Sequence, residues 1–152
     1  MRCAVTIKYE VFIINNSETI GKVHNSMYQQ LQKTGVATPV QVLIDVGVLS
    51  ASDYGRWRNG GVDYLERVCK VNLHKLAFIM KQVRGYARKN DLKPSWTFYK
   101  QWGNKGKKPS VKLRFSKSGN EDIERSYAMH YISQRLRAEQ KPLPNASKNT
   151  ED

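Results

Sequence analysis

The first apolar pattern in the chain repeats at every second residue. Thr6, Lys8 and Glu10 stand between apolar neighbours at positions 5, 7, 9, 11 and 13. Alternation of this kind is typical of a strand with one buried face, so we predict a strand over residues 5–13. A strand needs partners for its backbone groups, and none is near in the sequence. Residues 1–16 therefore form an N-terminal strand that pairs elsewhere, or a leader.

From residue 17 onward the spacing of apolar residues is helical. Ser17 is placed to cap a first helix, which Gly35 ends. Thr38 followed by Pro39 predicts the start of a short apolar helix that reaches Val46. A further helix begins after Ser50 and ends at Asn59, Gly60 and Gly61. Residues 64–68 form another short helical segment.

The longest apolar stripe of this part of the chain follows Asn72, which can cap a helix from Leu73 to about Asn90. Its predicted core face contains Leu73, Leu76, Ala77, Met80, Val83 and Ala87. Three cations form a shoulder beside that face at positions i, i+3 and i+7: Lys81, Arg84 and Arg88. We expect the stripe to be buried and the shoulder to be exposed.

After Pro94 the pattern changes to strands. Residues 96–102 and 111–116 predict a hairpin around a loop rich in Gly and Lys, and Asn120 caps a last helix. From residue 138 onward the chain is polar with two prolines, which favours a disordered tail over 138–152. The prediction is a mainly α fold: a small single-domain helical bundle over residues 17–137 with a basic β-hairpin over 96–116.

Charge is concentrated in one third of the 152 residues. The chain has 26 Lys and Arg against 13 Asp and Glu, a net charge of +13. Residues 67–118 contain 15 of these cations and a single acid, Asp91, whereas the flanking parts nearly balance. Such a run is often only a solvated surface, but positive charge without interspersed acids also indicates an anionic partner.

The basic third predicts a nucleic-acid interface, because aromatic side chains alternate there with cations. Trp102 lies beside the loop and is the predicted stacking residue, whereas Trp96 is expected to serve stability. The side chains that we expect to contact phosphates are Lys81, Arg84, Arg88, Lys100, Lys105, Lys107, Lys108, Lys112 and Arg114.

Residues 42–59 are similar to a helix-turn-helix, with an apolar helix, a glycine turn and a second helix. That second helix would present Ser52, Arg56 and Asn59 to a DNA groove. The fit is imperfect because Ser50 stands three positions after Gly47 instead of two. Simple packing of the two helices is the alternative interpretation.

Enzymatic interpretations have little support in the sequence. His24, His74 and His130 lack neighbours at metal-ligand spacing, and Cys3 and Cys69 form no metal-spaced pair. We predict no catalytic residues, no metal and no cofactor. The leading hypothesis is a non-catalytic nucleic-acid-binding protein, DNA or RNA. The alternative is a module that binds an acidic protein through the same face, and a nuclease comes third.

The chain has no apolar run long enough for a bilayer. Its longest, Leu76 to Met80, has five residues against the roughly 18–20 that a spanning helix needs. The N-terminus lacks the apolar core of a secretory signal. We therefore expect a cytoplasmic protein that contacts no membrane.

Several short motifs together resemble a group of small uncharacterised bacterial proteins, over residues 20–132. They are Arg56-Trp57-Arg58-x-Gly60, Tyr64-Leu65-Glu66, Asn72-Leu73-x-Lys75-Leu76, Leu92-Lys93-Pro94-Ser95-x-Thr97, Leu113-Arg114-Phe115-Ser116-Lys117-Ser118-Gly119 and Ile123-Glu124-x-x-Tyr127-x-x-His130-Tyr131. The resemblance implies a bacterial source and a single domain. It implies no activity, because that group has none assigned.

Overall fold

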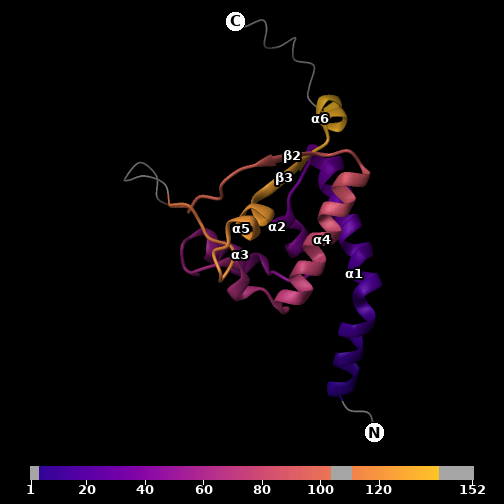
Figure 1. Cartoon of the computed structure of the whole chain (residues 1–152), viewed down its shortest axis with the longest axis vertical. Coiled ribbons are helices and arrows are strands. Elements are labelled where there is room, and N and C mark those ends of the chain that lie inside the picture. The colour runs from indigo at the N-terminus through magenta and orange to yellow at the C-terminus, as the bar shows by residue number, and fades with distance from the viewer. Residues whose placement is uncertain (1–3, 104–110, 141–152) are drawn as a thin grey trace, which may run out of the picture.

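Two long helices lie side by side and form one edge of the molecule (Figure 1). They are α1 (Ala4–Thr34) and α4 (Leu73–Lys89). This computed structural model describes residues 4–103 and 111–140, and it describes side chains from Asn16 to Glu139 within those ranges. The other elements are β1 (Val36–Ala37), α2 (Pro39–Val46), α3 (Ala51–Arg58), the 3-10 helix η1 (Leu65–Val68), β2 (Lys93–Trp96), α5 (Glu121–Ala128), β3 (Met129–Ile132) and α6 (Gln134–Gln140).

The N-terminal strand prediction is wrong, because residues 4–16 belong to α1. The apolar positions 5, 9, 12 and 13 also satisfy the i, i+4, i+7 and i+8 spacing of a helix. A helix bonds its backbone internally, whereas a lone strand needs a partner. The helix runs through Ser17, so this serine is no cap. The N-terminal half of α1 extends beyond the rest of the molecule (Figure 1).

The predicted starts of the next helices are confirmed by side-chain caps. Thr38 Oγ1 accepts from the Gln41 amide at 3.2 Å at the start of α2, and Ser50 Oγ accepts from the Asp53 amide at 3.0 Å at the start of α3. Asn72 Oδ1 accepts from the amide of Lys75 at 2.9 Å and begins α4. Each cap satisfies an amide that the first helical turn leaves unpaired.

The predicted core face of α4 is rotated about the helix axis relative to the face that is buried in the structure. Leu76, Ile79, Met80, Val83 and Ala87 are buried, whereas Leu73 is 60% exposed and Ala77 is also exposed. The buried positions follow i, i+3, i+4, i+7 and i+11, so the face is rotated toward Ile79. The structure thus confirms the helix and places its buried face part of a turn away from the predicted one.

A small antiparallel sheet brings together three segments that are far apart in the sequence. Its order is β1-β3-β2, with Trp96 of β2 opposite Met129 of β3. The helix α5 runs directly into β3, where the sequence predicted further helix. Residues 129–132 become a strand because β1 and β2 pair with them from both sides, which is a tertiary effect that local sequence does not reveal.

The predicted hairpin over 96–116 is present in reduced form. Its two arms run antiparallel around a single bridge between Lys100 and Lys112. The Gln101 amide donates to the Val111 carbonyl, and the Leu113 amide to the Tyr99 carbonyl, each at 2.8 Å. The regular strand β2 lies earlier than predicted and pairs with β3 instead of with residues 111–116.

A cluster of aromatic rings fixes these arms to the helices. Trp57 of α3 is fully buried, with Phe115 at 5.1 Å and Tyr99 at 5.7 Å between ring centroids. Its Nε1 donates to the Arg114 carbonyl at 2.8 Å. Phe115 stacks on Tyr127 of α5 at 5.4 Å. This cluster therefore connects α3, both arms and α5.

Helix α6 corrects the predicted boundary of the C-terminal tail. Residues 138–140 were assigned to a disordered tail but are helical, because Ser133 begins a helix by accepting from the amide of Leu136 at 3.2 Å. Residues 141–152, the remainder of the predicted tail, lie outside the described residues.

Candidate nucleic-acid interface

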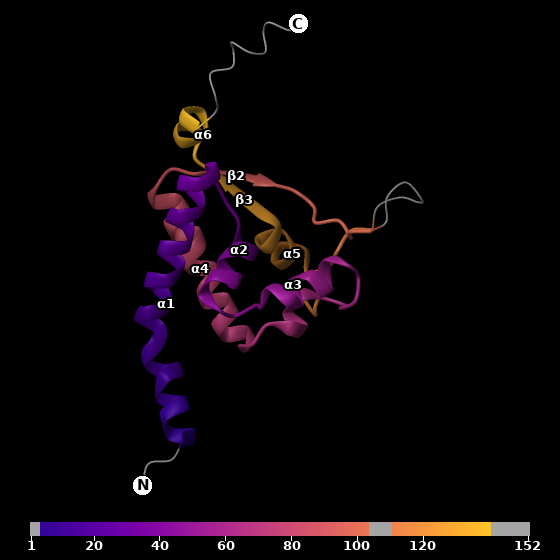
Figure 2. The same cartoon turned by 180° about the vertical axis from the view of Figure 1, so that it is seen from behind.

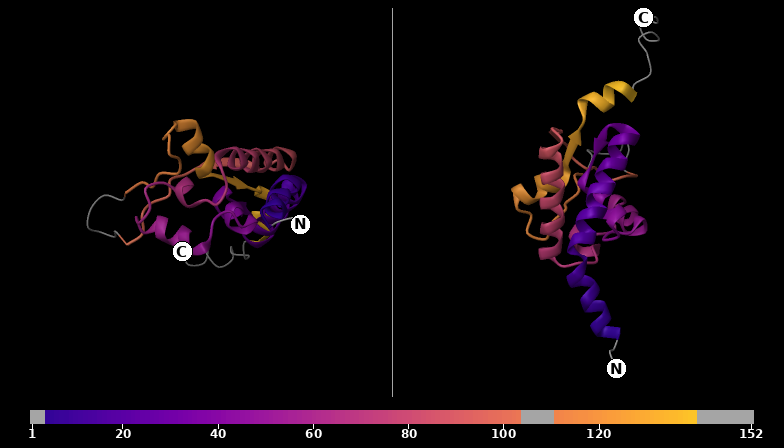
Figure 3. Two further views of the ribbon diagram at one scale, coloured as in Figure 1. Left: turned by 90° about the horizontal axis from the view of Figure 1, so that it is seen from below. Right: turned by 90° about the vertical axis from the view of Figure 1, so that its right-hand side faces the viewer.

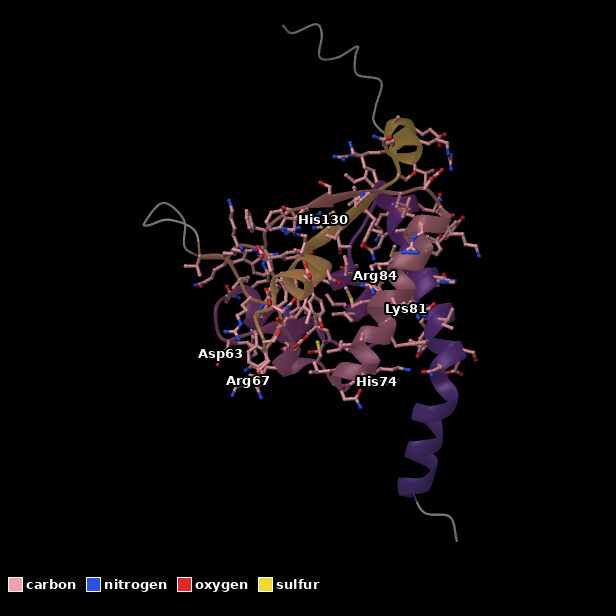
Figure 4. The ribbon with its side chains drawn as sticks, in the orientation of Figure 1. Asp63, Arg67, His74, Lys81, Arg84 and His130 are labelled. Atoms are coloured by element: carbon pink, nitrogen blue, oxygen red, sulfur yellow. The ribbon has the colours of Figure 1, made fainter. Side chains whose placement is uncertain are left out.

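The cationic shoulder of α4 is exposed as predicted. Lys81, Arg84 and Arg88 are all solvent-exposed, and Figure 4 shows Lys81 and Arg84 on α4. Arg84 donates to the hydroxyl of Ser126 on α5 at 3.4 Å. Burial raises the pKa of Tyr131 on β3, and the positive charges of Arg84 and Arg88 act in the opposite direction. The shoulder therefore lies beside both α5 and the central strand.

The arms of the hairpin place two further cations on one surface. Lys100 and Lys112 are bridged opposite each other and both are exposed. Residues opposite each other in an antiparallel pair share a face. The ammonium of Lys112 lies 4.4 Å from the centroid of Phe98, also on this surface. Lys105, Lys107 and Lys108, which we predicted to contact phosphates, lie outside the described residues.

The prediction for Trp96 is wrong, because this side chain is 46% exposed and does not belong to the core. Phe98 is exposed to the same extent and lies edge-on to Trp96 at 5.1 Å. The guanidinium of Arg125 on α5 lies 4.7 Å from the Trp96 centroid. Alternation along this arm points Tyr99 inward, so the buried aromatic is Tyr99 instead of Trp96.

Trp102 is exposed as predicted, at 45%, but it belongs to a separate cluster. The guanidinium of Arg58 lies 4.6 Å from its ring centroid, and Tyr54 meets its ring edge to face at 5.9 Å. Arg58 itself donates to the Tyr54 hydroxyl at 2.9 Å and to the Lys100 carbonyl at 3.0 Å. Both terminal nitrogens of its guanidinium are thus engaged within the protein, whereas its Nε is buried without a partner among the described residues.

Arg114 also makes its contacts within the protein. Its Nε donates to the Ser116 carbonyl at 2.8 Å and an Nη donates to the Lys117 carbonyl. The guanidinium lies 5.6 Å from the ring centroid of Tyr64. Arg114 therefore braces the turn after the second arm, although its side chain remains exposed.

Helix α5 brings the shoulder and the hairpin together. Figures 1 and 3 show α4 and α5 side by side on the same face. Arg84 contacts Ser126, and the preceding residue of α5, Arg125, lies over Trp96. We call this surface the basic-aromatic face. It consists of Lys81, Arg84, Arg88, Trp96, Phe98, Lys100, Lys112 and Arg125.

Arg125 and Phe98 were missing from the predicted site. Nothing in the sequence around Arg125 distinguishes it, because it follows the acidic first turn of α5 and reaches the site only through packing. Phe98 could have been found from its spacing, since it stands two residues before Lys100 and therefore on the same side of a strand.

Among the described residues, no carboxylate forms an ion pair with a cation of the basic-aromatic face. Within residues 4–103 and 111–140, the ion pairs join Arg56 to Asp53, Arg67 to Asp63 and Arg135 to Glu139. None of these six residues belongs to the face. The positive charge of the face is therefore compensated by no carboxylate within ion-pair distance in the described structure.

Two nearby carboxylates are turned toward backbone amides instead. Glu124 accepts from the Ser116 amide at 2.7 Å and from the Ser116 hydroxyl at 2.6 Å. Glu66 accepts from the Lys117 amide at 3.0 Å and from the Tyr127 hydroxyl at 2.9 Å. These contacts hold the end of the second arm between η1 and α5.

The helix-turn-helix residues are not brought to the basic-aromatic face. Helix α3 lies toward the opposite side of the molecule, which Figure 2 shows from behind. Ser52 is exposed, but Arg56 pairs with Asp53 at 2.9 Å and Asn59 donates to the Gly55 carbonyl at 2.9 Å. Two of the three predicted contacts are therefore engaged within α3.

A groove of about 720 Å³ lies between α1 and α2, away from the basic-aromatic face, and His130 borders it. Its acid, Asp45, accepts from the Ser26 hydroxyl at 2.6 Å and from the Gln41 amide group at 2.8 Å. Burial lowers the pKa of His130, whose Nε2 is buried without a hydrogen-bond partner among the described residues. Ser26, Gln41 and Asp45 bind one another within the groove, and we assign it no ligand.

The part of the chain that the structure describes contains no group of three His, Cys, Asp or Glu side chains arranged to hold a metal ion. None of its helices combines the length and the apolar character that crossing a membrane requires.

Comparisons with known proteins give no further guide. No protein-family model matches this chain, and no curated protein or solved structure shows significant similarity to it. The resemblance to a group of small bacterial proteins stays a prediction, and the function has to be argued from the residues of the chain itself.

Proposed function

We propose that this protein binds nucleic acid through the basic-aromatic face and catalyses no reaction on it. The observation that carries the proposal is the set of six cations on this face without a carboxylate partner in the described structure. They are Lys81, Arg84, Arg88, Lys100, Lys112 and Arg125. Such a surface favours a polyanion, because binding releases the counterions that nucleic acid condenses.

The aromatic rings beside the cations favour nucleic acid over other polyanions. Trp96 and Phe98 each expose nearly half of their surface within reach of Arg125 and Lys112. Bases stack on such rings while cations contact the phosphates on either side. An acidic protein would use the charges but gain less from the ring faces.

The test is a fluorescence-anisotropy titration of a labelled 20-nucleotide single strand and the matching duplex between 50 and 200 mM salt. Six phosphate contacts give a log-log slope of about −4.2 on the single strand and about −5.4 on the duplex. We expect single-strand affinity to fall about 340-fold over this range if all six contacts form. A slope near zero would contradict the proposal.

A matched pair of double variants locates the binding surface. Arg84→Glu with Arg88→Glu reverses two charges of the face, whereas Arg67→Glu with Arg135→Glu reverses two exposed, ion-paired charges outside it. We expect the first variant to flatten the slope by about 1.4 on the single strand, and the second to leave it unchanged. Equal effects would argue for binding through net charge alone. Binding of polyglutamate with no binding of nucleic acid would favour an acidic protein partner.

A further inference from the structure

A small cleft beside Trp96 indicates which form of nucleic acid the basic-aromatic face takes. The cleft measures about 160 Å³ and lies between the first hairpin arm and α5. Pockets that enclose drug-sized ligands measure about 300–1,000 Å³, so this space suits a single planar ring. Its border includes Trp96, Phe98, Lys112, Glu121 and Arg125, above a floor that includes Leu113.

The rings at the border leave stacking surface available. Trp96 and Phe98 meet at an interplanar angle of 60°, so their faces point in different directions. Each ring is 46% exposed and lies near a cation: Arg125 is nearest to Trp96, whereas Lys112 lies 4.4 Å from the Phe98 centroid and 6.0 Å from that of Trp96. A base that enters can therefore lie on a ring face or against the guanidinium plane, both of which stack on nucleobases.

The cations of the cleft differ from Arg58, which covers Trp102. Arg125 and Lys112 donate no hydrogen bond to any described group, whereas Arg58 is bonded to the Tyr54 hydroxyl and the Lys100 carbonyl. The donors of Arg125 and Lys112 are thus open to phosphate oxygens. A guanidinium lies over each ring at a similar distance, 4.7 Å for Arg125 over Trp96 and 4.6 Å for Arg58 over Trp102, but only the cations at Trp96 make no hydrogen bond to the described residues.

The carboxylate of Glu121 favours a base, and not a phosphate, as the group that enters the cleft. A carboxylate repels phosphate, whereas it accepts hydrogen bonds from the amino groups that adenine, cytosine and guanine carry. The cations outside the cleft then serve the neighbouring phosphates. On one side Arg84 stands next to α5 through its contact with Ser126, and on the other Lys100 stands opposite Lys112.

We propose that this cleft takes one unstacked base of a single-stranded nucleic acid, with Trp96 as the stacking ring. The inference rests on the proposed nucleic-acid-binding function. A base within a duplex is stacked on both faces and reaches such a cleft only after flipping, which costs a few kcal/mol. A single strand presents its bases without that cost. The face therefore prefers single strands to duplexes of equal length.

The experiment titrates a labelled 15-nucleotide single strand and the matching duplex with the full chain and its variants. Trp96→Leu keeps an apolar side chain but removes the aromatic face, and Trp96→Tyr keeps an aromatic ring. Loss of a stacked base corresponds to about 5- to 140-fold weaker single-strand binding. We expect that loss for Trp96→Leu, a much smaller one for Trp96→Tyr, and an unchanged salt slope for both. Trp102→Leu is the matched control and should change affinity less than twofold.

Thermal melts of each variant separate binding from folding. If Trp96→Leu unfolds, Phe98→Leu at the same cleft replaces it with the same expected loss. Wild-type affinity in a folded Trp96→Leu protein, equal losses on single strand and duplex, or a larger effect at Trp102 would overturn the inference. In those cases the Arg84 and Arg88 reversal still flattens the salt slope. Failure of the wild-type protein to bind any nucleic acid would instead overturn the proposed function.

Discussion

Replacing Trp57 by Phe tests whether the aromatic cluster holds the hairpin to the helices. Trp57 is fully buried, and its Nε1 donates to the Arg114 carbonyl at 2.8 Å. That carbonyl also accepts from the Leu65 amide at 3.2 Å, so it keeps one partner in the variant. The lost hydrogen bond then costs its net value of about 0.5–1.5 kcal/mol instead of the larger penalty of an unpaired acceptor.

The smaller ring adds a packing cost to this loss. Phe leaves part of the indole site empty, and the neighbouring rings Phe115 and Tyr99 contact it from two sides. Removal of a few buried carbons costs about 1–2 kcal/mol when the site cannot collapse. We therefore expect Trp57→Phe to lower the free energy of unfolding by about 1.5–3.5 kcal/mol. For a domain of this size that corresponds to a decrease in Tm of about 3–14 °C.

Urea denaturation followed by circular dichroism measures the change, with Trp96→Phe as the control. The control makes the same chemical substitution at a side chain that is 46% exposed and has no hydrogen bond from its indole in the described structure. Its free energy of unfolding should change by about 0.5 kcal/mol or less. Similar losses for the two variants would refute the conclusion that the cluster around Trp57 is the structural centre of the hairpin.

Three further predictions follow from the helices and their ends. Ile79→Ala should destabilise the protein by about 2–5 kcal/mol in urea denaturation, whereas Leu73→Ala on the exposed side of the same helix should change it by about 0.5 kcal/mol or less. Burial is the main cause that raises the pKa of the Cys69 thiol from 9.0 to about 12. Labelling of this thiol by iodoacetamide in the native protein should therefore stay slow at pH 8. The stability that the neutral thiol contributes should be present below pH 9 and lost as the pH rises toward 12. Gly35 has a φ of +81°, and an added Cβ would lie 2.8 Å from the backbone of Arg137, so Gly35→Ala should lower the Tm and displace α6, which proteolysis rates would detect.

Much of the helical architecture could be predicted because its signals are local. Thr38, Ser50 and Asn72 each cap the helix that follows, and a cap depends only on the next three residues. The alternation in residues 5–13 misled because it also fits a helix. The strand at 129–132 could not be predicted, since it exists only through partners that lie about 35 and 95 residues earlier in the chain.

The same distinction explains the outcome for the candidate site. The shoulder of Arg84 and Arg88 follows from helical spacing, and it is exposed despite the error in the predicted core face of α4. The exposure of Trp96 depends on the ladder between β2 and β3, which the sequence does not specify. Arg125 joins the site only because α5 packs beside α4. Sequence reasoning therefore identified five of the six cations of the face, but not the aromatic cleft that they border.

The direct junction of α5 with β3 has a consequence for the thermodynamics of ligand binding. Arg125 stands four residues before Met129, and Met129 lies opposite Trp96 in the sheet, so both walls of the cleft belong to one hydrogen-bonded unit with no loop between them. A ligand that enters such a preformed space orders few additional groups, and each rotamer-rich side chain that need not be immobilised spares about 0.5–1.5 kcal/mol. Association should then proceed in a single kinetic phase, with an observed rate constant that rises linearly with ligand concentration.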